Sequence, residues 1–145
     1  ARGTRLVRDL CQGACSGVFD VLGVRGGLLW FRGAADGRRD EVWVTDGKST
    51  RRVADLSTPL PLGPVGDRML FAAHDGETGY QIWSSDSTAA GTVRVSDFPP
   101  DASWLPETVA VLPDRIIFAA TDAEHGAEPW TCDGTETRLI KDINP

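Results

Sequence analysis

The sequence predicts an all-β fold built from three repeats, and three observations predict it. A Phe and a Trp recur at a fixed spacing in three places, a Thr-to-Asp frame recurs in four, and no segment shows a sustained helical period. The chain has 145 residues, of which 41% are hydrophobic and 25% charged, as in ordinary globular domains. We therefore expect residues 1–145 to form a single repeat domain with a core of its own.

The Phe–Trp frame is the stronger of the two repeats. In each copy the Phe precedes the Trp by 12 residues, and an Asp follows the Trp by three. The three copies are Phe31, Trp43 and Asp46; Phe71, Trp83 and Asp86; and Phe118, Trp130 and Asp133. We expect the aromatic side chains to fill the space between neighbouring repeats. Each Asp is expected to fix a hairpin turn by accepting a backbone N–H two residues on.

The second frame is a Thr, four residues and an Asp, followed by an apolar residue. It occurs at residues 4–9, 50–55, 92–97 and 137–142. We expect each of these segments to be the last strand of a four-stranded unit. The first has no unit before it, so it predicts a lone strand within residues 1–10. The three repeats that follow are then 11–56, 57–98 and 99–145.

Turn-forming residues divide each repeat into four short strands. The strands predicted for the middle copy are 62–65, 68–73, 81–85 and 92–98, and those for the last copy are 107–112, 115–120, 128–132 and 137–143. Tandem four-stranded units of about 40–50 residues are typical of propeller blades. The sequence thus predicts a β-propeller-like fold with three four-stranded blades and one extra N-terminal strand. Since propellers usually have four to eight blades, we expect a longer array, a partner chain, or self-association that closes a ring.

The residues around each Trp resemble a known repeat. The three segments read Glu41-Val-Trp-Val-Thr-Asp-Gly, Gln81-Ile-Trp-Ser-Ser-Asp-Ser and Glu128-Pro-Trp-Thr-Cys-Asp-Gly-Thr. They resemble the ELWxxDGT repeat family of secreted bacterial proteins. This resemblance implies a propeller-like β architecture and an extracellular or cell-surface location, and it implies no reaction.

Charge and cysteine content limit the classes of partner. The net charge of −6 disfavours nucleic acid as a partner, and no apolar stretch is long enough to span a membrane. Cys11 and Cys15 lie four residues apart, so a local disulfide and a pair of reduced thiols are both compatible with the sequence. Cys132 stands alone, and the spacing of Cys and His does not suit zinc.

No residue is expected to be catalytic and no cofactor is expected. His74 and His125 occupy different positions in their repeats, and there is no Gly-x-Ser-x-Gly motif. Calcium binding by the acidic loops is an alternative, although neither loop has EF-hand spacing. The loop carboxylates concerned are Asp75, Glu77, Asp122 and Glu124.

Trp30 and Trp104 lie outside the Phe–Trp frame and are the candidate contact residues. Trp30 precedes Phe31 and should point to the opposite side of its strand, while Trp104 lies in a Pro-rich connection. Such aromatics either cover a core or bind a partner or a sugar ring. We therefore expect a non-enzymatic, secreted or cell-surface scaffold for protein–protein interaction. The alternatives are a carbohydrate-binding module that uses these loop tryptophans, and a hydrolase with an unrecognised acidic site.

Overall fold

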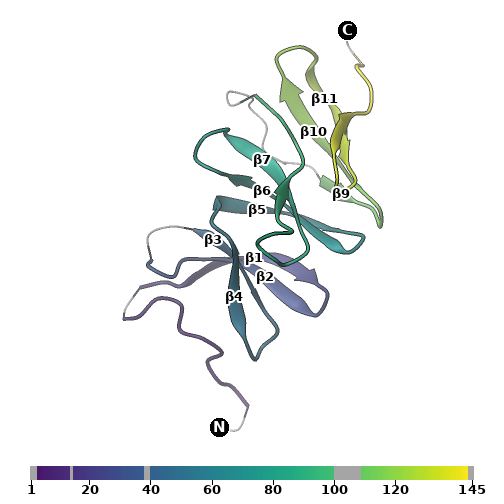
Figure 1. The fold of residues 1–145 in the computed structure, drawn as a ribbon. Helices are drawn as coiled ribbons and strands as arrows, with labels where there is room; N and C mark the ends of the chain where they lie inside the picture. Colours follow the sequence, from purple (N-terminus) through teal and green to yellow (C-terminus); the bar gives the residue numbers. More distant parts are fainter. Residues whose placement is uncertain (1–2, 14, 38–39, 100–108, 144–145) are drawn as a thin grey trace.

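The regular structure of the chain is entirely β, as the sequence predicts. The computed structural model describes residues 3–13, 15–37, 40–99 and 109–143, and in these residues there are twelve strands and no helix. The strands form three antiparallel four-stranded sheets, which we name sheet A (β1–β4), sheet B (β5–β8) and sheet C (β9–β12). Sheet B lies between sheet A, near the N-terminus, and sheet C, near the C-terminus (Figure 1).

Each sheet is a meander in which strands that follow one another in sequence are neighbours. Sheet A consists of β1 (Val18–Arg25), β2 (Leu28–Gly33), β3 (Glu41–Thr45) and β4 (Thr50–Ala54). Sheet B consists of β5 (Ser57–Val65), β6 (Arg68–His74), β7 (Tyr80–Ser85) and β8 (Val93–Arg94). Sheet C consists of β9 (Val109–Val111), β10 (Ile116–Asp122), β11 (Gly126–Cys132) and β12 (Thr137–Leu139). Sheets A, B and C lie within residues 11–56, 57–98 and 99–145 respectively.

The Phe and Trp of each repeat lie directly opposite one another on the second and third strands of a sheet. The three cross-strand pairs are Phe31 with Trp43, Phe71 with Trp83, and Phe118 with Trp130. Large aromatic side chains in directly paired positions contact each other and stabilise a sheet. The fixed spacing in the sequence therefore corresponds to one register that all three sheets share.

Two hydrophobic clusters join the sheets. In the first, Trp30, Val42 and Val44 of sheet A pack with Met69, Phe71 and Ala73 of sheet B. In the second, Leu70, Ala72 and Ile82 of sheet B pack with Ile116, Phe118 and Ala120 of sheet C. We call these contacts the A–B seam and the B–C seam. At each seam the Phe of one sheet faces the sheet that precedes it, and burying such a ring stabilises the fold by about 2–3 kcal/mol.

The first strands of the three sheets lie next to one another. β1 contacts β5, and β5 contacts β9. Gly63 of β5 has a φ of 127° and lies against Val111 of β9. Because glycine has no Cβ, the two strands approach closely at this point. The sheets are therefore tightly apposed at the edge formed by their first strands.

The predicted lone strand at the N-terminus is wrong. Residues 3–10 form no strand, and the first strand of the described chain is β1. A strand needs a neighbouring backbone for its hydrogen-bond ladder. The N-terminal segment instead lies across the outer face of sheet A, where Leu10 packs with Phe31 and Trp43.

The fourth strands of sheets B and C are shorter than predicted. β8 covers two residues of the predicted 92–98, and β12 covers three of the predicted 137–143. Just beyond each strand one more backbone hydrogen bond forms, from the Val95 N–H to the Ile82 carbonyl and from the Ile140 N–H to the Pro129 carbonyl. Further on, side chains of the third strand hold the chain. Gln81 holds Phe98 in this way, and a carboxylate oxygen of Glu128 accepts a hydrogen bond from the Ile143 N–H.

Candidate functional site

The outer face of sheet A carries the Phe–Trp pair that has no sheet against it in the described chain. Phe31 and Trp43 form a small cluster with Leu10 and the partly buried Leu29. Neighbouring residues alternate between the two faces of a strand, and Trp30 accordingly belongs to the A–B seam on the other side. Phe31 therefore points away from sheet B.

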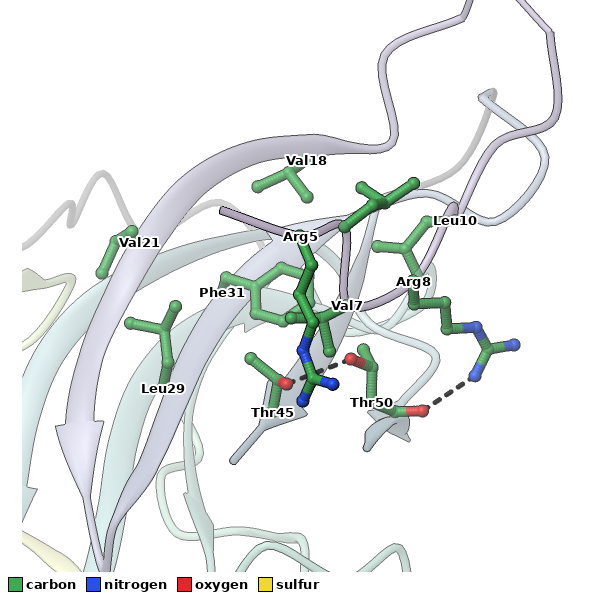
Figure 2. Close-up of a pocket in the computed structure, with 11 residues that line it drawn as sticks. Arg5, Val7, Arg8, Leu10, Val18, Val21, Leu29, Phe31, Thr45 and Thr50 are labelled. Carbon is green, nitrogen blue, oxygen red and sulfur yellow. Dashed lines mark hydrogen bonds between the residues drawn. The ribbon is translucent and has the colours of Figure 1, made fainter. Parts of the chain in front are cut away.

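A pocket of ≈ 250 Å³ lies on this outer face, between sheet A and the N-terminal segment. Figure 2 shows the segment crossing over β1 and β2, with Phe31 and Leu29 beneath it. The lining is mostly apolar and consists of Arg5, Leu6, Val7, Arg8, Leu10, Val18, Val21, Leu29, Phe31, Thr45 and Thr50. We call this surface the sheet A face.

The N-terminal segment is held to the sheet A face by a few contacts. The Arg8 guanidinium donates a hydrogen bond to the Thr50 carbonyl at 2.8 Å and lies 5.3 Å from the centre of the Trp43 ring. Leu10 is buried, but Leu6 remains 79% exposed. On β1, Val18 and Val21 are also more than half exposed. The segment therefore covers the face only in part.

A disulfide fixes the base of this segment. Cys11 and Cys15 are bonded to each other, with their Cα atoms 5.8 Å apart. Gly37 packs closely against this disulfide. A Cβ added at Gly37 would lie only 3.0 Å from the Cys11 sulfur. The disulfide is the first of the two states that the sequence left open. Cys132 is a free, buried thiol, and burial raises its pKa.

Of the two tryptophans outside the repeat frame, Trp30 is buried in the structure and Trp104 is not among the described residues. Trp30 is 1% exposed and belongs to the A–B seam, so its ring face is not available to stack on a partner or a sugar. Its burial agrees with the alternative in which it covers a core. Trp104 lies outside the described residues.

The Asp residues that follow each Trp fix the hairpin turns. Their side-chain oxygens accept the backbone N–H two residues on, from Lys48, Thr88 and Thr135, at 2.8–2.9 Å. These are the hydrogen bonds expected for Asp46, Asp86 and Asp133. They lower the pKa of all three carboxyls, with the Ser49 N–H as the largest cause for Asp46 and a Thr hydroxyl for the other two.

A second pair of Asp residues lies where the second strand meets the loop to the third: Asp75 directly follows β6, and Asp122 is the last residue of β10. Asp75 accepts backbone N–H groups from Glu77 and Thr78, and mainly the Thr78 N–H lowers its pKa to about 2. Asp122 accepts a hydrogen bond from the ring of His125 at 2.9 Å, which raises the pKa of His125.

The Asp carboxylates of these acidic loops accept hydrogen bonds from residues of the same loops. His74 likewise uses its Nδ1 to accept the N–H of Gly76 at 2.8 Å. In the part of the chain that the structure describes, no three His, Cys, Asp or Glu side chains are grouped so that they could hold a metal ion. In the same residues, no helix has the length and apolarity needed to cross a membrane.

The sequence reading assigned no role to the Glu or Gln two residues before each Trp, yet all three side chains are buried. They are Glu41, Gln81 and Glu128. Glu41 accepts hydrogen bonds from the Trp43 indole N–H and from Arg52. The sequence contains a sign of this role, because a polar residue recurs two positions before each Trp in a strand that is half-buried. A polar side chain that recurs at a buried position needs a hydrogen-bond partner.

Comparison with known proteins assigns no family to this chain. A scan against family models, a search of curated proteins and a search of solved structures each give no match. The geometry of the sheet A face and of the two seams therefore carries the functional inference.

Proposed function

We propose that this chain is a non-enzymatic scaffold for protein–protein interaction, and that its sheet A face binds a further four-stranded sheet. The observation that supports this is the shared register of the Phe–Trp pairs. Phe31 occupies the register of Phe71 and Phe118, and both of those pack against a preceding sheet. An apolar face with this register is suited to the same kind of contact.

A second copy of the chain supplies the matching surface. On β10, Ile117 and Ala119 lie one residue before and one residue after Phe118, on the opposite side of the strand. Their counterparts in sheet B, Leu70 and Ala72, are buried at the B–C seam. In sheet C, Ile117 is half-buried and Ala119 is exposed. One chain thus carries both halves of a third seam, which two copies can complete.

In this proposal the three sheets are blades of a β-propeller. The contacts of β1 with β5 and of β5 with β9 support a radial arrangement, in which the first strands lie nearest the axis. Two copies would close a ring of about six blades, within the usual range. The resemblance to ELWxxDGT repeats supports the same architecture. The Cys11–Cys15 disulfide supports an oxidising, extracellular location.

The N-terminal segment must move aside for the second copy to bind. Its contacts with the sheet are those of Arg8 and Leu10, and most of the segment is exposed. We expect the segment to act as a removable cover over apolar side chains that would otherwise face water.

Oligomeric state tests the proposal. We would measure molar mass by analytical ultracentrifugation for the wild type and for single variants that place a charge on each face, Val21→Glu and Ala119→Glu. Both residues are exposed, so neither variant should unfold the chain. The control is Val93→Glu, because Val93 is an exposed Val on sheet B, which contributes to neither proposed face.

The expected result is a dimeric wild type and control, and two monomeric variants. A mixture of the two variants should form a heterodimer, because one chain then offers an unaltered sheet A face and the other an unaltered sheet C face. A wild type that stays monomeric at high concentration would overturn the proposal. Two variants that fail to associate when mixed would also overturn it, because they would indicate a contact between identical faces.

A further inference from the structure

The residue four positions after each repeat Trp lies in the turn between the third and fourth strands, and in two sheets it contacts the preceding sheet. These residues are Gly47, Ser87 and Gly134, and their φ values are 81°, 80° and 91°. Ser87 accepts two hydrogen bonds from Arg51 of sheet A, one at its carbonyl and one of 2.9 Å at its hydroxyl. A Cβ added at Gly134 would lie 3.7 Å from Cδ of Arg68 in sheet B. The turn residue is therefore part of both seams.

Gly47 is the member of this set without such a contact. It is exposed, whereas Ser87 is half-buried and Gly134 is buried. A Cβ added at Gly47 would meet no atom within 4 Å. Sheet A has no preceding sheet in the part of the chain that the structure describes. Gly47 thus lies where a preceding sheet would contact the turn.

The register of the fourth strands shows which residue of a preceding sheet reaches this turn. Arg51 lies opposite Val44, which belongs to the A–B seam, and directly paired residues share one face of a sheet. In sheet C the residue of the same register is Arg138, which lies opposite Thr131. Thr131 in turn lies opposite Ile117. Sheet C therefore presents an arginine in the register of Arg51, on the face that points away from sheet B.

The B–C seam makes the contact with the turn in another way. In sheet B the register of Arg51 holds Val93, whose side chain has no hydrogen-bond donor. Arg68 lies beside Gly134 instead, and its guanidinium donates to the Gly91 carbonyl of its own sheet at 2.6 Å. An arginine of the preceding sheet thus contacts the turn at both seams.

Arg138 is available for a contact with another chain. Its side chain is 66% exposed, and it forms an ion pair with Glu136, two residues before it. Exposed ion pairs contribute little to stability, so Arg138 can exchange this partner for another acceptor. The turn at Gly47 carries one negative charge, on Asp46, and one positive charge, on Lys48. These charges balance, so the turn has no net charge that repels an arginine.

The N-terminal segment supports a second copy of the chain as the partner. Residues 4–9 read Thr-Arg-Leu-Val-Arg-Asp and residues 137–142 read Thr-Arg-Leu-Ile-Lys-Asp, so four of the six are identical. Arg5 and Arg8 line the same pocket as Thr45 and Thr50, the residues that flank the β3–β4 turn. Arg8 also donates to the Thr50 carbonyl. The sheet A face thus already holds a segment that resembles the fourth strand of sheet C.

We propose that Arg138 of each copy donates hydrogen bonds to the Gly47 carbonyl of the other copy, as Arg51 donates to Ser87 within one chain. This inference rests on the proposed self-association and names a polar contact that aligns the two faces. A hydrogen bond from a guanidinium is directional and charge-assisted, so it selects one alignment of two apolar surfaces. Two copies that close a ring complete two such seams, and the dimer therefore contains the contact twice.

A double-mutant cycle on the dimer of the intact chain tests this contact. Arg138→Ala removes the donor, and Gly47→Ser adds the hydroxyl acceptor that Ser87 provides in sheet B. The turn tolerates serine, because Ser87 has nearly the same φ as Gly47. Arg94→Ala is the matched control, since it removes a positive charge from the fourth strand of sheet B. Analytical ultracentrifugation measures the Kd of each dimer.

We expect Arg138→Ala to raise the Kd at least about tenfold, because each seam loses a hydrogen bond from a charged donor. Gly47→Ser should lower the Kd about threefold or more in the otherwise wild-type chain, because the arginine gains a second acceptor. In the Arg138→Ala background the same change should alter the Kd by less than about twofold. Arg94→Ala should stay within about twofold of the wild type.

A Kd of Arg138→Ala equal to that of the wild type would overturn this inference and leave the self-association standing. Equal effects of Gly47→Ser in both backgrounds would overturn it too, because the hydroxyl would then not act through Arg138. Weakening by Arg94→Ala as large as that by Arg138→Ala would show a general effect of charge, which also contradicts the inference. A monomeric wild type overturns the self-association, and this contact with it.

Discussion

The Gln81 side chain pairs with both backbone groups of Phe98. Its Oε1 accepts a hydrogen bond from the Phe98 N–H at 3.0 Å, and its Nε2 donates to the Phe98 carbonyl at 2.7 Å. Oε1 also accepts from the Ser96 hydroxyl at 2.7 Å. Gln81 is completely buried. The amide therefore substitutes for one rung of a β-ladder and anchors the chain where it leaves sheet B.

Replacing this amide should destabilise the fold strongly. We expect Gln81→Leu to lower the free energy of unfolding by about 2–4 kcal/mol, because buried groups of Phe98 and Ser96 lose their partners. Urea unfolding followed by circular dichroism measures this. Gln12→Leu is the control at an exposed Gln, with an expected change within about 0.5 kcal/mol. Equal effects of the two substitutions would show that the amide does not anchor the chain.

The close approach of β5 and β9 makes a second prediction. A Cβ added to Gly63 would lie 2.8 Å from Val111 Cγ2, and the φ of 127° is itself unfavourable for other residues. We expect Gly63→Ala to lower the free energy of unfolding by about 2–4 kcal/mol, measured by thermal unfolding. Gly66→Ala, at a φ of 55° with no atom within 4 Å, should cost only about 1 kcal/mol. A cost for Gly63→Ala no greater than that would contradict the importance of this contact.

The first two members of the Phe series, Phe31 and Phe71, should differ in the monomer. Phe71 is completely buried between sheets A and B, so Phe71→Ala should cost about 3–5 kcal/mol. On its outer side Phe31 packs with Leu10 of the N-terminal segment, which can collapse into the space that the ring leaves. We therefore expect Phe31→Ala to cost clearly less. Equilibrium unfolding of monomeric protein compares the two, and a larger cost at Phe31 would be the contrary result.

The Asp loops predict a loss of stability in acid. The folded pKa of Asp75 is about 2, below its ordinary value of 3.8. The unfolded chain therefore takes up the proton first, and the contribution of this carboxylate is complete above about pH 4 and lost as the pH falls toward 2. The urea midpoint should fall across this range, and less steeply in Asp75→Asn. Carboxyl NMR titration checks the cause directly, and an Asp75 midpoint near 3.8 would rule it out.

The Phe–Trp register could be predicted from the sequence because two separate packing contacts constrain each Phe. A ring such as Phe71 must pair with Trp83 across two strands and must also reach the preceding sheet. Both requirements leave a periodic trace in the sequence. The same reasoning located the hairpin turns at Asp46, Asp86 and Asp133, where a short acidic side chain accepts nearby N–H groups.

The N-terminal segment could not be predicted in this way. Residues 4–9 carry the same local pattern as residues 50–55, which include all of β4. A strand also depends on a partner backbone, and a local pattern contains no information about it. For the same reason the sequence did not reveal that Gln81 ends the β8 ladder, since this depends on which way a buried amide points.

The separate hydrophobic clusters of the A–B and B–C seams have an evolutionary consequence. Trp30 fills one seam where Leu70 fills the other, and the two residues belong to different clusters. A substitution at one seam therefore leaves the packing of the other unaltered. Gene duplication or deletion could add or remove one whole sheet, and each seam could then diverge by itself. A protein with one shared core lacks this freedom, because its interior must change as a whole.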